Sequence, residues 1–149
     1  MIGAGVIGLE LGTVWRRLGS EVEVIEFLPR VLNGMDSEVS EKFHKILLQQ
    51  GLKFKLEHSV EKTSLIKDKV HVEIKDIKTS KTDILEADIV LVAVGRRPNT
   101  DNLGLDKIGV KVDKRGFVET DDNFKTSVDN IYAIGAVSYT HLTLPTRRG

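Results

Sequence analysis

The chain has 149 residues, enough for one ordinary globular domain with a hydrophobic core. Its 22 basic and 22 acidic side chains cancel, so the composition indicates neither nucleic acid nor a membrane as a partner. It contains no cysteine, which excludes a disulfide framework, a thiolate metal site and thiol–disulfide exchange by these residues themselves.

The chain opens on a glycine-rich turn. Gly3, Gly5 and Gly8 form the pattern Gly-x-Gly-x-x-Gly, which normally leads out of an apolar strand and into a helix. Met1 and Ile2 are therefore interpreted as the end of a truncated first strand. Apolar residues at near-helical spacing predict a helix that stops at Gly19.

A second strand and a second helix follow. Residues 21–25 alternate charged and apolar side chains, which predicts a strand ending at Glu26. Asp36 is the predicted N-cap of the second helix, and Gly51 is its predicted stop. The predicted apolar face of this helix consists of Val39, Phe43, Ile46 and Leu47.

Beyond Gly51 the apolar pattern changes to a period of two. It predicts a short parallel strand at 52–56 and then an antiparallel meander up to Ile84. Residues 89–94 are continuously apolar, as in a strand buried on both faces. Short strands are also predicted at 116–119 and 131–133, with loop between them. The predicted fold class is α/β, a Rossmann-like parallel sheet with an antiparallel β-meander.

These elements predict a dinucleotide site. The three glycines provide in turn a tight bend, a close approach of the backbone to a pyrophosphate, and room for the helix against the strand. Glu26 lies about 20 residues further on, where its carboxylate can accept hydrogen bonds from the adenosine ribose. A carboxylate repels a 2′-phosphate and no basic residue follows at once, so NAD is favoured over NADP. The alternative is a glycine turn that only packs a helix on a sheet, with Glu26 as a solvent-facing strand end.

Glu10 and the four histidines have less specific explanations. Glu10 lies near the start of the first helix, where it either interacts with the helix dipole or faces the ligand, and the dipole is the simpler explanation. The histidines do not stand at metal-ligand spacing, so no metal site is predicted.

Three motifs, taken in order, carry a family resemblance. They are Gly-Ala-Gly-Val-Ile-Gly-Leu-Glu at 3–10, Val-Gly-Arg-Arg-Pro-Asn at 94–99 and Asn-Ile-Tyr-Ala-Ile-Gly at 130–135. Together they resemble the pyridine-nucleotide disulfide oxidoreductase family, in which an NAD(P) domain is inserted into an FAD domain. The resemblance covers about residues 1–136. Within the family, the segments at 10–12, 24–27 and 49–51 are most similar to the branch that oxidises dihydrolipoamide with NAD⁺.

The resemblance implies roles for particular residues. It implies cofactor contacts through Gly3, Gly5, Gly8, Glu10, Glu26 and Gly95. The first three would hold the NAD pyrophosphate, and Glu26 would hold the adenosine ribose. Gly95 would approach the nicotinamide, and Glu10 and the flavin would lie near that ring. Arg96 is either a flavin-side or domain-contact residue or a solvated loop arginine. Where the family has an aspartate that contacts the flavin ribityl chain, this sequence has Ala136.

The expected organisation is an NAD(H)-binding domain at 1–95, a return segment toward the FAD domain at 96–136, and a non-native tail at 137–149. The tail resembles translated sequencing-adapter read-through and does not continue the preceding pattern.

The resemblance also implies what the intact parent does. It would oxidise dihydrolipoamide with FAD and a redox-active disulfide and reduce NAD⁺, as a homodimer serving 2-oxo acid dehydrogenase complexes. It would act in the mitochondrial matrix of a eukaryote or the cytoplasm of a bacterium. The catalytic cysteines and acid–base pair are not in these residues, so the chain alone is expected to bind NAD at most. Two alternatives stay open: another flavin oxidoreductase, such as an NADH oxidase or a mercuric-reductase-like enzyme, and a stand-alone nucleotide-binding or redox-sensing module.

Overall fold

The computed structural model describes residues 1–135. Contacts divide the chain into two compact units, Met1–Gly95 and a second unit that begins at Arg96. The predictions for Ala136 and for the tail at 137–149 lie outside the described residues.

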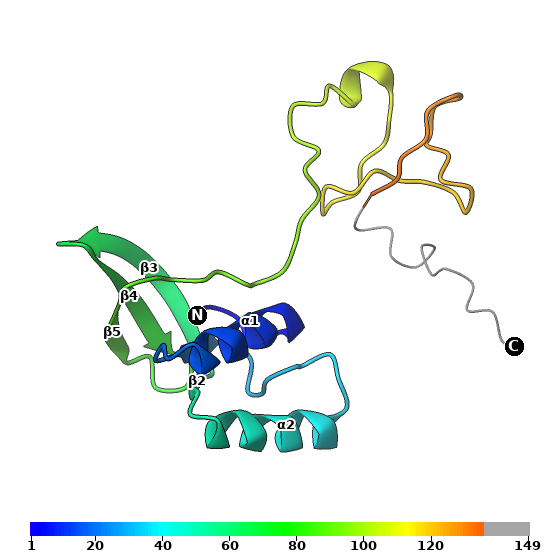
Figure 1. Cartoon of the computed structure of the whole chain (residues 1–149). Helices are drawn as coiled ribbons and strands as arrows, with labels where there is room; N and C mark the ends of the chain where they lie inside the picture. Colours follow the sequence, from blue (N-terminus) through cyan, green and yellow to red (C-terminus); the bar gives the residue numbers. More distant parts are fainter. Residues whose placement is uncertain (136–149) are drawn as a thin grey trace, which may run out of the picture. The chain divides into compact units, whose positions relative to one another are not determined.

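The first unit is built on parallel strands (Figure 1). β1 (Glu23–Glu26) and β2 (Lys53–Leu56) pair in parallel. Isolated parallel bridges join Ile2 to Ile25 on one side and to Val92 on the other. The spatial order is therefore β2, β1, the chain around Ile2 and the chain around Val92, which is the order found in the first half of a dinucleotide-binding sheet. The predicted Rossmann-like parallel sheet is confirmed.

Two helices accompany these strands at the predicted positions. α1 (Val6–Arg17) has Leu18 as its C-cap, and Gly19 follows with a φ of +98°, which a glycine adopts without strain. α2 (Ser37–Gln49) begins after Asp36, whose carboxylate accepts hydrogen bonds from the backbone of the first turn.

The face that α2 buries differs from the predicted one. Ser40 and Leu47 are buried and Phe43 packs against the core cluster that contains Leu47, whereas Val39 is 51% exposed and Ile46 is 47% exposed. The buried hydroxyl of Ser40 donates to the Leu32 carbonyl at 3.2 Å. A polar residue can occupy this face because the backbone turn beneath it supplies an acceptor, which a hydropathy pattern does not reveal.

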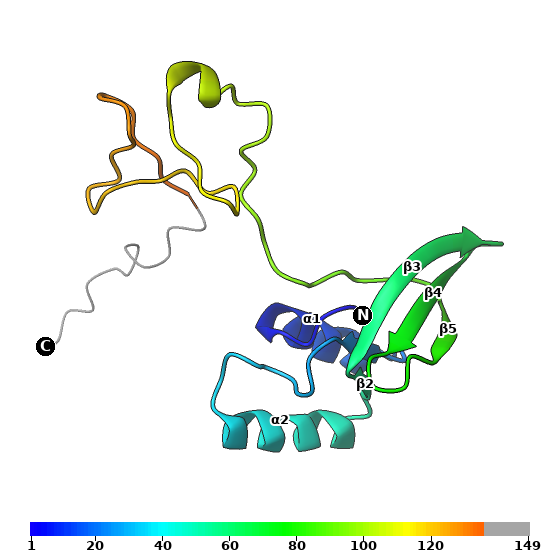
Figure 2. The ribbon, with the colours of Figure 1, turned by 180° about the vertical axis from the view of Figure 1, so that it is seen from behind.

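An antiparallel meander makes up the rest of the first unit, as predicted. It comprises β3 (His58–Ile66), β4 (Lys69–Asp76) and β5 (Thr82–Ala87), paired in that order. In both Figure 1 and Figure 2 the meander lies apart from α2.

The two faces of β1 supply two parts of the core. Successive strand residues point to opposite faces. Val24 packs with Leu9 and Leu47 of the helices, whereas Ile25 packs with Ile74 of the meander. The parallel strands thus form the middle layer between helices and meander.

The prediction of a doubly buried strand at 89–94 is wrong. Only Val92 forms a bridge, and Ile89, Val92 and Val94 are 70%, 62% and 69% exposed. Within the described residues this segment has a neighbour on one side only, the chain around Ile2, so it forms an edge of the parallel layer. An apolar, β-branched run predicts a strand but does not reveal what covers it.

The second unit consists mainly of turns. The predicted strands at 116–119 and 131–133 are reduced to isolated bridges, Val112 with Val118 and Lys125 with Tyr132. The segment that precedes residue 116 contains a short 3₁₀ helix, η1 (Asp106–Ile108). Across residues 1–135, no helix combines the length and hydropathy that a membrane span requires.

Candidate dinucleotide site

The turn of the first sequence motif lies beside the segment that leads to Gly95, at the carboxyl ends of the parallel segments. The Gly3 amide donates to the Ile25 carbonyl at 2.8 Å, and the Ala93 amide donates to the Ile2 carbonyl at 2.8 Å. Ligands of open α/β sheets bind at this edge, where the strand order reverses. The turn at Gly3 and the segment leading to Gly95 lie together at that point.

The three glycines of the first motif have different surroundings. A Cβ on Gly3, whose φ is +98°, would lie 2.6 Å from the Ala93 carbonyl oxygen. A Cβ on Gly8 would lie 2.7 Å from the Gly3 carbonyl oxygen and 3.2 Å from the Ala93 Cβ, so it would separate α1 from the sheet. A Cβ on Gly5 would meet nothing within 4 Å. Packing within the chain explains Gly3 and Gly8, whereas at Gly5 the open space leaves room for a group from outside.

The start of α1 is free to receive an anion. Gly5 is its N-cap and provides no side-chain hydrogen bond to the first turn, and that turn contains no acidic residue. The unpaired amides at a helix N-terminus favour negative charge. Glu10 is exposed and lies beyond the first turn. Because the helix dipole acts mainly within that turn, the dipole explanation for Glu10 is not supported.

Glu26 is bound on both carboxylate oxygens. Its Oε2 accepts a hydrogen bond from the Ala4 amide at 2.6 Å, and its Oε1 accepts one from the Leu28 amide at 2.9 Å. The side chain is half-buried at the end of β1, so it is not a simple solvent-facing strand end. Each carboxylate oxygen has a second acceptor position, which leaves capacity for ribose hydroxyls.

The residues that directly follow Glu26 in the sequence provide no free basic side chain. Phe27 and Leu28 follow it and are 61% and 37% exposed. The next basic residue is Arg30, whose guanidinium donates to Asn33 Oδ1 at 3.3 Å and to the Asn33 carbonyl at 3.2 Å. Arg30 is therefore engaged within its own turn.

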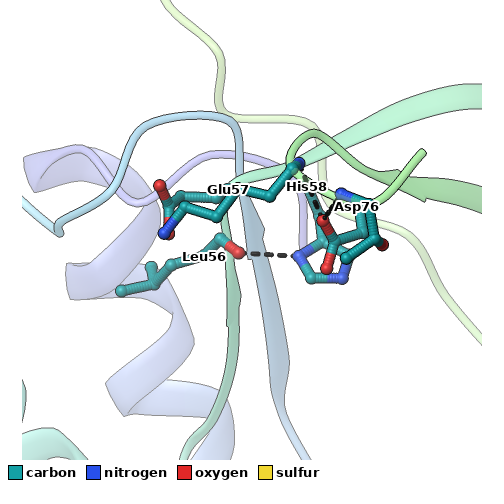
Figure 3. A network of polar contacts seen from close by, with 6 residues as sticks. Leu56, Glu57, His58 and Asp76 are labelled. Carbon is teal, nitrogen blue, oxygen red and sulfur yellow. Dashed lines mark hydrogen bonds and ion pairs between the residues drawn. The ribbon is translucent and has the colours of Figure 1, made fainter. Parts of the chain in front are cut away.

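A polar network supports the strand end beside Glu26 (Figure 3). Leu56, the register partner of Glu26, has its carbonyl 2.6 Å from His58 Nδ1. Glu57 forms an ion pair with Lys78 at 2.6 Å, which ties the end of β2 to the turn after β4. In that turn, hydrogen bonds from the Thr79 and Lys78 amides hold the pKa of Asp76 below its ordinary value.

The remaining predicted residues are Gly95, the last residue of the first unit, and Arg96, the first residue of the second. Gly95 has a φ of +117°, which strongly favours glycine, and a Cβ there would meet nothing within 4 Å. Arg96 is exposed at the start of the second unit.

A separate hollow of the first unit lies away from this site. A cavity of about 540 Å³ lies between the amino ends of the parallel segments, with Met1, Glu23, Lys53 and Ile89 in its lining. It is at the opposite ends of the strands from the glycine turn, so it is not the dinucleotide site. Residues 1–135 contain no cluster of three His, Cys, Asp or Glu side chains that could hold a metal ion.

Sequence reasoning did not identify Ala4, Leu28 and Leu32 as contributors to the glycine turn. The Ala4 carbonyl accepts from the Leu32 amide at 3.0 Å, and its amide is bound by Glu26. These are backbone contacts, for which side-chain identity gives no signal.

An α/β domain with a glycine turn, an uncapped helix start and an acidic strand end at the switch point has the architecture that is typical of dinucleotide-binding domains. Residues 1–147 match the pyridine nucleotide-disulphide oxidoreductase family, and the chain belongs to that family.

Curated relatives agree with this membership. The chain is 52% identical over 137 residues to a dihydrolipoyl dehydrogenase of Cupriavidus necator, a match that covers 92% of this chain and 29% of that protein. It is 52% identical to the mitochondrial dihydrolipoyl dehydrogenase of Dictyostelium discoideum, covering 91% and 28%, and 46% identical to that of Homo sapiens, covering 92% and 27%. The chain thus spans less than a third of the length of these relatives.

A solved structure is similar as well. The Cu(II) complex of the HOCl-induced flavoprotein disulfide reductase RclA from Escherichia coli matches with a TM-score of 0.80 at 32% identity, covering 90% of this chain and 29% of that one. The α/β architecture is therefore shared with flavoprotein disulfide reductases.

Proposed function

We propose that the first unit binds NAD(H) at the glycine turn. The observation that supports this most directly is the contrast among the three glycines of the first motif, because of Gly3, Gly5 and Gly8 only Gly5 has open space around the position of a Cβ. That space adjoins the uncapped start of α1, where amides favour an anion such as a pyrophosphate.

Each residue has a distinct part in this proposal. Gly3 makes the bend, Gly5 lets the pyrophosphate approach the backbone, and Gly8 lets α1 lie close to the sheet. Glu26 accepts hydrogen bonds from the adenosine ribose hydroxyls. Gly95 approaches the nicotinamide, and Glu10 of α1 lies near it. When bound, the nicotinamide ring supplies hydride transfer.

NAD is the proposed cofactor in preference to NADP. A 2′-phosphate would meet the Glu26 carboxylate, and the nearest following cation, Arg30, is bonded to Asn33. Like charges brought together without a compensating cation are strongly unfavourable.

For the whole protein we propose the activity of dihydrolipoyl dehydrogenase, which is the name of the relatives at 46–52% identity. It would oxidise dihydrolipoamide with FAD and a redox-active disulfide, deliver the electrons to NAD⁺ at the site described here, and work as a homodimer with 2-oxo acid dehydrogenase complexes. Its location would be the mitochondrial matrix in a eukaryote or the cytoplasm in a bacterium. This chain alone has no cysteine and would be inactive.

Two measurements test the proposal. In titration calorimetry the chain should bind NADH at least about ten-fold more tightly than NADPH, because a like-charge contact costs several kcal/mol. A folded chain that binds neither would refute the site. The complete protein carrying this chain should reduce NAD⁺ with dihydrolipoamide. Oxidation of NADH by O₂ or by Hg²⁺ instead would identify another flavin oxidoreductase, and a protein without flavin would be a nucleotide-binding module.

A further inference from the structure

We infer that Glu26 is a positioning residue for the glycine turn as well as a ligand for the cofactor: its carboxylate holds the turn in the binding conformation before any nucleotide arrives. The part that concerns cofactor binding rests on the proposed function. The part that concerns the turn rests on contacts within the first unit.

A buried residue of the turn, Ala4, is held at both of its polar backbone atoms. Ala4, between the first two glycines of the motif, is 1% exposed. Its amide donates to Glu26 Oε2 at 2.6 Å, and its carbonyl accepts from the Leu32 amide at 3.0 Å. The last residue of β1 therefore holds the amide of Ala4, and the segment that follows β1 holds its carbonyl.

The other oxygen of the same carboxylate fixes that segment. Glu26 Oε1 accepts from the Leu28 amide at 2.9 Å, so one side chain joins the glycine turn to the bend after β1. Hydrogen bonds to an ionised acceptor are the stronger class, and a buried amide that loses its acceptor is costly. No other side-chain acceptor is bonded to the Ala4 amide in the described part of the chain.

Glu26 therefore affects both the choice between NAD and NADP and the conformation of the glycine turn before the cofactor binds. A substitution that removes the negative charge of Glu26 to admit a 2′-phosphate also removes an acceptor from the turn that receives the pyrophosphate. Dinucleotides should then bind more weakly even when they make no contact with the ribose hydroxyls.

Hydrogen exchange of the ligand-free chain tests the positioning role. Glu26→Gln keeps the shape of the side chain but can accept at only one of the two positions. We expect the Ala4 or Leu28 amide to exchange about ten-fold faster or more, because local protection reports the free energy of opening. The Leu9 amide, bonded to the Gly5 carbonyl in α1, should change much less. Equal acceleration at Leu9 and Ala4 would indicate general destabilisation and overturn the inference, as would unchanged exchange in both Glu26→Gln and Glu26→Ala.

A matched control is available on α2. Glu41 is exposed there, and Glu41→Gln removes the same charge without touching the turn. It should leave the exchange of Ala4 and Leu28 unchanged.

A pair of ligands separates positioning from ribose recognition. ADP and 2′,3′-dideoxy-ADP carry the same phosphates, and only ADP has ribose hydroxyls. If Glu26 acts through the turn, Glu26→Gln weakens both ligands; if it acts only on the ribose, the dideoxy ligand binds the variant and the parent equally, which overturns the inference. Should the parent bind neither ligand, the proposed function fails, while the exchange experiment still decides whether Glu26 positions the turn.

Discussion

Alanine substitutions at Gly3 and Gly5 should separate folding from nucleotide binding within one motif. Gly3 has a φ of +98°, and its Cβ would lie 2.6 Å from a backbone oxygen that cannot move aside as a flexible side chain would. Gly5 has a φ of −77°, and its Cβ would enter open space. The two positions carry the same residue for different physical reasons.

The expected magnitudes follow from these geometries. A non-glycine residue in an unfavourable backbone region costs about 1–3 kcal/mol, and overpacking against a rigid neighbour costs about 1–3 kcal/mol more. Gly3→Ala should therefore lower the free energy of unfolding by about 2–5 kcal/mol, a large share of the roughly 5–15 kcal/mol typical of a domain. Gly5→Ala should lower it by no more than about 1 kcal/mol, since alanine in place of a good N-cap costs about 1 kcal/mol and glycine costs roughly a few tenths.

Urea unfolding and NADH titration of the two variants test this reasoning. Gly3→Ala should shift the unfolding midpoint, whereas Gly5→Ala should keep the midpoint and lower NADH affinity by about ten-fold or more, equivalent to about 1.4 kcal/mol. If Gly5→Ala binds NADH as well as the parent does, the pyrophosphate does not approach this residue. If Gly3→Ala unfolds at the parent's midpoint, the close approach to Ala93 is not a constraint on the fold.

Two further predictions concern α2. Asp36→Ala removes the acceptor for the Glu38 and Val39 amides and should lower stability by about 1 kcal/mol in thermal unfolding; an unchanged midpoint would show that the cap contributes nothing. Burial lowers the pKa of His44 from 6.5, and its Nε2 is buried without a hydrogen-bond partner in the described structure. The unfolded state therefore binds the proton more tightly, so stability is present above about pH 6.5 and is lost as the pH falls from there through the lower folded pKa. His44→Phe keeps an aromatic contact with Phe54 and should lose less stability than the parent between pH 7.5 and 5.5 in urea unfolding; an equal loss would contradict this.

Local patterns were sufficient to predict the helices and the meander of the first unit. The spacing of apolar residues together with Asp36 and Gly19 predicted both helices, and the change to a period of two predicted the meander. These predictions succeed because caps, turns and side-chain periodicity act over a few residues.

Coverage by other segments was not predictable in the same way. The run at 89–94 has the composition of a central strand, yet it lies at an edge in the described structure, with Ile89 70% exposed. Ser40 occupies a core-facing position because a distant carbonyl is within reach. Burial depends on which segments arrive from elsewhere in the chain, and hydropathy along the sequence does not contain that information.

The sequence by itself determined the chemistry of the candidate site, because the glycine spacing and the carboxylate about 20 residues later are properties of residue type and order. Only the tertiary structure decided how those residues divide their roles. It brings Ala93 against Gly3, leaves Gly5 open, and directs both oxygens of Glu26 to backbone amides. The physical reason is that a glycine can be required by backbone conformation, by close packing or by an approaching ligand, and the letters of a motif do not distinguish these causes.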